Sequence, residues 1–270
     1  MLCFPISAQI AERYRAGRVF LVGDAAHAMP PTGGFGANVG IQDAYDLAWK
    51  LAFVLQDQAS ARLLETYQAE RLPVAEFTLG QALARTHDRM RSGTAPDGPP
   101  LADYAAVVFG YQYRSTAIPG AIDDETTALT SRELRAQPGT RAPHATVTTA
   151  RGARSILDLF GSDFTLVVGR DGAPWRRAAS AVAARLQLPL TLLQLDSELE
   201  DASGQLQERY RLGTEAAVLI RPDGFVAWRC EHENADSERA FERVLERVLE
   251  RILGKESSAR TSLAPRGLVH

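Results

Sequence analysis

A segment dense in glycine and proline limits the possible fold more than any other part of this chain. Residues 23–38 read GDAAHAMPPTGGFGAN. Glycine tolerates positive φ and lets a backbone approach a ligand closely, whereas proline stiffens the chain beside it. The apolar run before it, residues 17–24 (GRVFLVGD), is typical of a buried strand in a parallel sheet. We therefore predict a strand, a glycine-rich turn and a helix in succession.

A long helix is predicted to begin between residues 36 and 38, because apolar side chains follow at helical spacing. The positions that form this apolar face are Ile41, Ala44, Ala48, Leu51 and Leu55. Asp43 and Asp46 then fall on the polar side of the helix, and Trp49 is expected to pack in the core.

Two further signals follow this helix. Ser60 is placed to cap the next helix, and Pro73 should break or restart that helix because proline lacks an N–H group. Helical character then continues to about Arg91. The stretch SGTAPDGPP, residues 92–100, has loop composition and suggests a boundary, and residues 122–143 resemble a polar connector.

The last hundred residues have a different rhythm. Short apolar runs at 164–169, 190–195, 216–220 and 225–230 predict strands, and the Pro-Asp-Gly turn between the last two predicts a hairpin. An alanine-rich helix is predicted over 174–185, and an amphipathic helix over 237–254 that ends at Gly254. The order β-α-β-(α)-β-β-α is that of a thioredoxin-like domain.

The fold class is therefore α/β. The expected divisions are a first domain over 1–92, a connector over 93–143, a thioredoxin-like domain over 144–254 and a disordered tail over 255–270.

Composition excludes several classes of protein. The 270 residues are 45% hydrophobic, enough for two ordinary cores, and the formal net charge of −3 gives no basic surface for nucleic acid. No apolar run reaches the ~18 residues of a membrane span, and the N-terminus does not read as a signal peptide. Cys3 and Cys230 have no metal-binding or CxxC spacing, so we predict no metal and a cytoplasmic location.

Two interpretations of residues 23–38 remain open on the residues alone. The unpaired amides at a helix N-terminus bind anions, and Asp24 at the strand end would accept hydrogen bonds from ligand hydroxyls. Alternatively, the small residues serve only a tight strand-to-helix crossover.

The run GRVFLVGDAAHAMPPTGGFGANVGIQDAYDLAWKLAFVL resembles the second FAD motif of the flavoprotein aromatic hydroxylases, the family of para-hydroxybenzoate hydroxylase and phenol hydroxylase. LLETYQAERLPVA, QPGTRAPH and RPDGFVAWR are also similar to segments of that family, and the last two are typical of its polyketide and phenol hydroxylase branch. The resemblance implies hydroxylation of an aromatic substrate, such as a polyketide, with FAD, NADPH and O2 through a flavin C4a-hydroperoxide.

The resemblance also implies that the first part is a partial FAD-binding, Rossmann-like domain, and it assigns the cofactor-binding residues. Asp24 would bind the ribityl hydroxyls of FAD, and Pro31 would lie along the isoalloxazine edge. The glycine turn would bring backbone amides to the N1–C2=O2 edge of the flavin. The turn and its amides comprise Gly33, Gly34, Gly36, Ala37 and Asn38.

No catalytic residue is predicted. His27 is expected to pack or to bond within its loop, and His144 to hold the connector against the first domain. The alternating Arg and Glu side chains of residues 238–251 are expected to form a solvated helix face.

The family's GxGxxG loop for the ADP part of FAD does not occur in these 270 residues. The chain would therefore be the C-terminal half of a hydroxylase, a truncated relative without flavin that acts as a polyketide-binding or cyclase-like protein, or an interaction module. We expect a partner chain carrying the N-terminal half, or a homodimer, and we expect the isolated chain to be colourless and not to oxidise NADPH.

Overall fold

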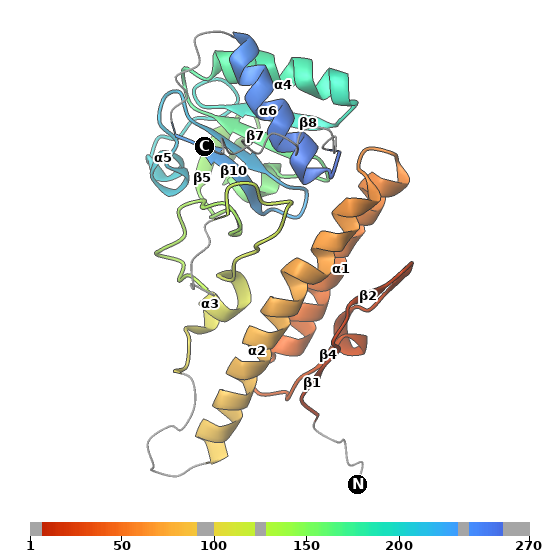
Figure 1. The fold of residues 1–270 in the computed structure, drawn as a ribbon. Coiled ribbons are helices and arrows are strands. Elements are labelled where there is room, and N and C mark those ends of the chain that lie inside the picture. Colours follow the sequence, from red (N-terminus) through yellow and green to blue (C-terminus); the bar gives the residue numbers. More distant parts are fainter. Residues whose placement is uncertain (1–6, 91–99, 122–127, 232–237, 256–270) are drawn as a thin grey trace, which may run out of the picture.

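The computed structural model describes residues 7–90, 100–121, 128–231 and 238–255. They form a mixed α/β fold with a pair of long helices below a sheet that carries its own helices (Figure 1). The predicted α/β class is confirmed. Cys3, most of the 92–100 loop, residues 122–127 of the connector and the tail from residue 256 onward lie outside the described residues.

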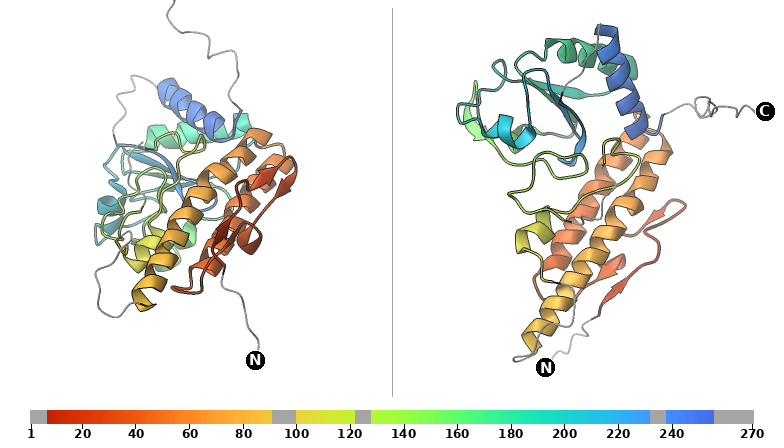
Figure 2. Two further views of the ribbon diagram at one scale, coloured as in Figure 1. Left: turned by 60° about the horizontal axis from the view of Figure 1, so that its bottom comes forward. Right: turned by 60° about the vertical axis from the view of Figure 1, so that its left-hand side comes forward.

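The first part of the chain consists of four very short strands and three helices, with two 3₁₀ turns between them. In chain order these are β1 (Gln9–Ile10), β2 (Arg15–Ala16), β3 (Val19–Phe20), the 3₁₀ turn η1 (Gly23–Ala25), β4 (His27–Ala28), α1 (Phe35–Leu55), the 3₁₀ turn η2 (Ala61–Glu65), α2 (Thr66–Met90) and α3 (Tyr104–Phe109). Helices α1 and α2 run side by side, and the short strands lie along α1 (Figures 1 and 2).

The predicted buried parallel strand over 17–24 is wrong. Only Val19–Phe20 forms a strand, and it pairs antiparallel with Arg15–Ala16. Gly17 has a φ of +59°, so the chain turns back at once into a tight hairpin. No parallel strand pairs with this run among the described residues. A strand of 2 residues is also too short to form the core of a sheet.

Helix α1 is present as predicted, but its burial is the reverse of the prediction. Most of the predicted apolar face is exposed, with Ile41 66% and Leu55 80% accessible, whereas Leu51 is half-buried. Asp43 and Asp46, predicted on the polar side, are buried at 0% and 1% accessibility. The opposite face of α1 packs between α2 and the η1 turn, and cations from elsewhere in the chain neutralise its carboxylates.

The prediction that Pro73 breaks the second helix is also wrong, because α2 continues through it to Met90. Pro73 and Ala69, whose carbonyl loses its N–H partner, are both exposed, so water can satisfy that carbonyl. The buried side of the helix, which includes Tyr67 and Val74, holds it in place. The predicted cap is confirmed, since Ser60 Oγ accepts a hydrogen bond from the Arg62 amide.

The second part is built on a four-stranded sheet with helices on both faces. Its elements are β5 (Thr146–Thr149), β6 (Gly152–Ser155), the 3₁₀ turn η3 (Ile156–Leu159), β7 (Phe164–Val168), α4 (Ala173–Leu186), β8 (Leu190–Gln194), α5 (Gln205–Tyr210), β9 (Ala217–Ile220), β10 (Val226–Cys230) and α6 (Glu238–Ile252). The strand order is β10-β9-β7-β8, with β7 and β8 parallel and the other pairs antiparallel. This topology is thioredoxin-like and confirms the predicted strands, whereas the β5–β6 hairpin was not predicted.

The sheet is buried on both faces, because successive side chains of a strand point to opposite sides. Leu166 and Leu219 face α4 and α6, whereas Val167 and Val218 face the core that includes α5. Gly254 has a φ of +64° and ends α6 as predicted.

The two parts share one hydrophobic core. Trp49 and Phe53 at the end of α1 pack edge-on against Phe164 of β7, so Trp49 is a core residue as expected. Ser60 adds two hydrogen bonds, its amide to Leu253 O at 2.9 Å and its hydroxyl to Gly254 O at 2.7 Å. The end of α1 is thus fixed to the thioredoxin-like part.

Candidate functional site

The turn that carries Asp24 is a 3₁₀ turn, and its first residue requires glycine. Gly23 has a φ of +59°, and its Cα lies so close to α1 that a Cβ on Gly40 would be 3.1 Å from it. The amide of Ala26 closes the turn by donating to Gly23 O at 2.8 Å. This geometry leaves the Asp24 side chain exposed.

The glycine turn before α1 leaves the helix N-terminus open. Gly33 and Gly34 have φ values of +89° and +66°, and the Gly34 amide donates to Pro31 O at 3.0 Å. Gly34 is the N-cap and has no side chain to accept from the first helical amides. Those amides therefore remain available to an external acceptor at the positive end of a helix of 21 residues.

The residues predicted to bind the cofactor lie on the surface of this segment. Asp24, Pro31, Gly34, Ala37 and Asn38 are exposed, and Gly33 and Gly36 are partly exposed. The structure brings the turn and the helix N-terminus together, since η1 packs directly on α1. Their role in binding remains a prediction.

A buried cluster lies behind the turn. His27 Nε2 lies 2.7 Å from Asp43 Oδ2, the Gly23 amide donates to the same oxygen at 3.2 Å, and Arg71 Nε donates to Asp43 Oδ1 at 2.6 Å. Arg71 Nη1 also donates to Tyr113 Oη at 2.9 Å. His27 therefore bonds within its own neighbourhood, as predicted. Asp43 accepts bonds from the loop, from α2 and from β4.

Electrostatics favour the ionised form of this carboxyl. Burial alone would raise the pKa of Asp43, but the hydrogen bond from His27 and the charge of Arg71 outweigh burial and hold that pKa below its ordinary value. The buried carboxylate is thus a fixed negative charge directly behind the candidate site.

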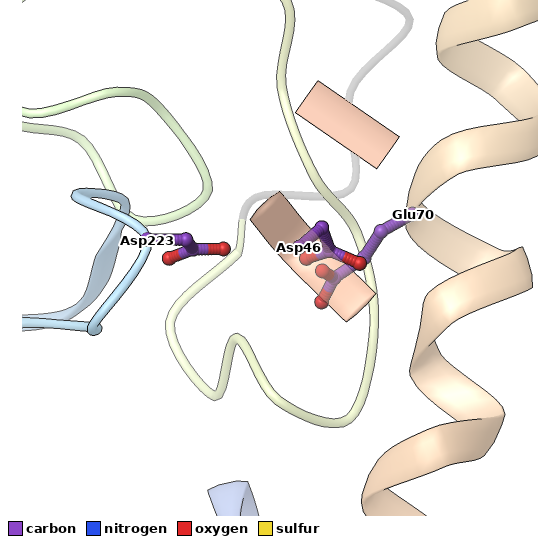
Figure 3. Close-up of side chains that lie close together, drawn as sticks. All are labelled: Asp46, Glu70 and Asp223. Carbon is purple, nitrogen blue, oxygen red and sulfur yellow. The ribbon is translucent and has the colours of Figure 1, made fainter. Parts of the chain in front are cut away.

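A second buried cluster joins the two parts of the chain. Asp46 from α1, Glu70 from α2 and Asp223 from the β9–β10 turn converge there (Figure 3). Arg221 Nη1 and Nη2 donate to the two Glu70 oxygens at 2.7 and 2.9 Å. Lys50 Nζ donates to Asp46 at 2.7 Å and to Glu70 at 2.8 Å.

This second cluster has the chemistry of an ion-pair network rather than of a metal centre, because protein N–H donors already bond its carboxylates. Burial raises the pKa of Asp46 well above its ordinary value, since attraction to Lys50 does not offset burial and repulsion from Glu70. Burial also opposes ionisation of Glu70, yet Arg221 and Lys50 lower the pKa of Glu70 below its ordinary range. The raised pKa favours protonation of Asp46, which would reduce the excess of negative charge in the cluster.

Sequence reasoning missed Arg71 and Arg221. Both lie in segments already noted for their family resemblance, LLETYQAERLPVA and RPDGFVAWR, so the signal was present without a structural role attached to it. His144 was assigned a role that the structure does not support: its Nδ1 lies 2.7 Å from Ser155 Oγ, within the thioredoxin-like part. The polar face of α6 also packs in part, because Arg185 of α4 bonds Glu246 at 2.7 Å.

A small cavity lies beside the N-terminus of α1. Its volume is about 10 Å³, and its lining includes Phe35, Asn38, Thr78 and Tyr111. That is room for about one water molecule. The Thr78 and Tyr111 hydroxyls have no hydrogen-bond partner within the described residues, but the surface that faces this cavity is apolar.

Comparison with known families identifies both parts of the chain. Residues 1–82 match the family model described as "FAD binding domain", and residues 135–255 match the model described as "Aromatic-ring hydroxylase, C-terminal".

Several named proteins are similar over most of the chain. Aklavinone 12-hydroxylase RdmE of Streptomyces purpurascens is 43% identical over 237 residues, which is 88% of this chain and 44% of that protein. 4-Methyl-5-nitrocatechol 5-monooxygenase of a Burkholderia species is 41% identical over 87% of this chain and 44% of that protein. The chain thus spans less than half the length of these relatives.

Solved structures agree with the sequence matches. The ternary complex of aklavinone-11 hydroxylase with FAD and aklavinone superposes with a TM-score of 0.86 at 42% identity, over 92% of this chain and 45% of that one. The rebeccamycin biosynthetic enzyme RebC with reduced flavin superposes with a TM-score of 0.72 at 32% identity, over 92% and 47%. In the part of the chain that the structure describes, no helix has the length and apolar character needed to cross a bilayer.

Proposed function

Because this chain belongs to the FAD-dependent aromatic-ring hydroxylases, we propose that it is part of an enzyme that hydroxylates an aromatic polyketide with NADPH and O2. The chain would supply the protein groups that bind the edge of the flavin ring, together with the C-terminal domain. The premise is the match of residues 1–82 to the FAD-binding domain and of residues 135–255 to the hydroxylase C-terminal domain. The polyketide is proposed because named relatives are polyketide and aklavinone hydroxylases.

The observation that carries the proposal is the uncapped N-terminus of α1, lying beside an exposed acidic turn. The Asp24 carboxylate would accept hydrogen bonds from the ribityl hydroxyls of FAD. The amides of Gly36, Ala37 and Asn38 would point at the N1–C2=O2 edge of the ring, and the preceding glycines permit that approach. Pro31, exposed in the same segment, would lie along the ring edge.

The chemistry of oxygen transfer is that of the flavin when it is bound. This chain contributes a fixed electrostatic environment. Amides at the positive end of a long helix stabilise negative charge near N1, and they need no reorganisation because the helix is already formed.

A partner polypeptide is part of the proposal. The exposed apolar face of α1, with Ile41 and Leu55 at its ends and Ala44 and Ala48 between them, has no covering element among the described residues. Apolar stripes of this kind usually mark an interface. We propose that the FAD-domain polypeptide present in the longer relatives covers it.

The alternative is a relative that binds a polyketide without flavin. A polyketide binder needs an enclosed apolar pocket of several hundred Å³. The small cavity beside α1 holds only about 10 Å³. The larger hollow, of about 550 Å³, is open and lined by Arg132, Arg135, Glu208 and other polar residues. Neither of these two cavities fits a large aromatic ligand, and the two family matches favour the hydroxylase proposal.

The test is reconstitution. The purified chain alone should be colourless and should not oxidise NADPH. Co-expressed with the part of RdmE that this chain does not match, it should co-purify as a yellow complex with a flavin-to-chain ratio near one. Aklavinone should then stimulate NADPH oxidation and yield a product heavier by one oxygen.

A matched pair of variants locates the flavin. Asp24→Asn should reduce the flavin content of the complex, whereas Asp171→Asn, an equally exposed aspartate near the start of α4, should not. A complex that forms but carries no flavin would refute the hydroxylase proposal. Light scattering on the chain alone then distinguishes a homodimer from a monomer awaiting its partner.

A further inference from the structure

The contacts of Asp43 suggest a role for it within the proposed flavin site, and this inference rests on that proposed function. We infer that Asp43 is a positioning residue: its buried carboxylate fixes the turn that carries Asp24 relative to the helix N-terminus that carries Gly36–Asn38. A flavin would then meet its ribityl-binding and ring-binding groups at a preset spacing.

Asp43 bonds the turn directly. Its Oδ2 accepts from the Gly23 amide at 3.2 Å, one residue before Asp24. The same oxygen lies 2.7 Å from His27 Nε2, on the strand that leaves the turn. The turn is thus held on both of its sides by one side chain, whose accessible fraction is 0%.

Asp43 also acts on the start of α1 through Arg71. Arg71 Nε donates to Asp43 Oδ1 at 2.6 Å, and Arg71 Nη2 donates to Val39 O at 3.1 Å, in the first turns of the same helix. Arg71 is also fully buried. The planar guanidinium joins two points of α1 in a geometry that a lysine cannot reproduce.

The backbone of the turn contacts the helix where Asp43 holds it. The Cα of Gly23 lies against Gly40, three residues before Asp43. A hydrogen bond and a close backbone contact at one crossing leave little freedom in the distance between turn and helix. Binding groups that need no rearrangement bind more tightly, because less ordering is required on association.

Hydrogen exchange of the chain without ligand tests whether Asp43 ties these segments together. The variants are Asp43→Asn and, as a matched control on the same buried helix face, Asp46→Asn. Asp43→Asn should accelerate amide exchange in peptides over 21–28 and 33–40 together, whereas Asp46→Asn should leave both unchanged. If Asp43→Asn does not fold, Arg71→Lys takes its place, because lysine keeps the positive charge but lacks the planar guanidinium. This variant should also accelerate amide exchange in both peptides.

Ligand binding tests the consequence for flavin. Riboflavin carries both ribityl chain and ring, whereas lumiflavin carries the ring alone. In Asp43→Asn, riboflavin affinity should fall by about fivefold or more, as expected when one hydrogen bond no longer forms, while lumiflavin affinity stays unchanged. General destabilisation would weaken both ligands equally.

The outcomes separate this inference from the proposed function. If the wild-type chain binds neither riboflavin nor lumiflavin, alone or reconstituted, the proposed function is refuted. Amide hydrogen exchange then still decides whether Asp43 holds the turn against the helix. If wild type binds riboflavin but Asp43→Asn binds it equally well, or if only one of the two peptides exchanges faster, the positioning role is wrong.

Discussion

Replacing Arg221 by methionine should destabilise the fold by roughly 3–5 kcal/mol, the usual result when one partner of a buried ion pair is removed. Arg221 is fully buried and donates to both Glu70 oxygens, to Asp46 at 3.2 Å and to Asp223 at 3.1 Å. Without it, Lys50 is the remaining cation that pairs with Asp46 and Glu70 among the described residues, and Asp223 keeps no cationic partner there. The methylene stem of methionine preserves most of the volume, so the loss measures charge and hydrogen bonding.

Urea denaturation followed by circular dichroism would measure the effect, with thermal melting as a second readout. At about 2–4 °C per kcal/mol for a chain of this size, the melting temperature should fall by roughly 6–20 °C. The control is Arg185→Met, which removes an exposed pair with Glu246 and should cost at most ~1 kcal/mol. If the two variants lose similar stability, the buried cluster does not hold the two parts together as described.

Three further results are expected. Because buried cationic partners lower the pKa of Glu70 in the folded state, its contribution to stability is complete above its ordinary value of 4.5 and is lost as the pH falls below it; the urea midpoint should therefore drop in acid, and Glu70→Gln should flatten that dependence. Gly40→Ala places a Cβ 3.1 Å from the Gly23 Cα and should cost roughly 1–3 kcal/mol by urea denaturation. Gly80→Ala on α2 meets nothing within 4 Å and should be neutral or stabilising by up to ~1 kcal/mol. Ile41→Lys, at a 66% exposed position, should change stability by less than ~0.5 kcal/mol yet abolish pull-down of the complementary RdmE segment; unchanged capture would place the interface elsewhere.

Local patterns were sufficient to predict the four-stranded sheet of the thioredoxin-like part, but not its β5–β6 hairpin. Its strands are bounded by turn residues, and the Pro-Asp-Gly turn lies between β9 and β10 as expected. Helix periodicity also predicted α1 and α6 close to their observed bounds. These features depend on residues near one another in sequence, so a single sequence contains them.

The burial of α1 could not be predicted in the same way. Apolar spacing identified one face of the helix correctly, but the assumption that this face is the buried one failed. The face that is buried carries Asp43, Asp46 and Lys50, whose partners Arg71 and Arg221 lie far along the chain. A carboxylate on a helix is predicted to face solvent unless the distant cation that pairs with it is known. A single sequence does not show covariation between the carboxylate and that cation.

The candidate site shows the same division. The glycine turn and Asp24 were identified from composition and resemblance, and the structure places them on an open surface. Asp43 was assigned to the wrong environment because its three partners come from a turn, a strand and a second helix.

The pairing of Glu70 with Arg221 also has a consequence for how the chain is made. The two residues are 151 positions apart. At a synthesis rate of about 5–20 residues per second, a ribosome needs roughly 8–30 s to add Arg221 after Glu70. During that interval Asp46 of α1 and Glu70 of α2 lack their partner Arg221. The nascent helices therefore cannot complete their native packing until nearly the whole chain has been translated, and a chaperone that binds them in the meantime would favour folding over aggregation.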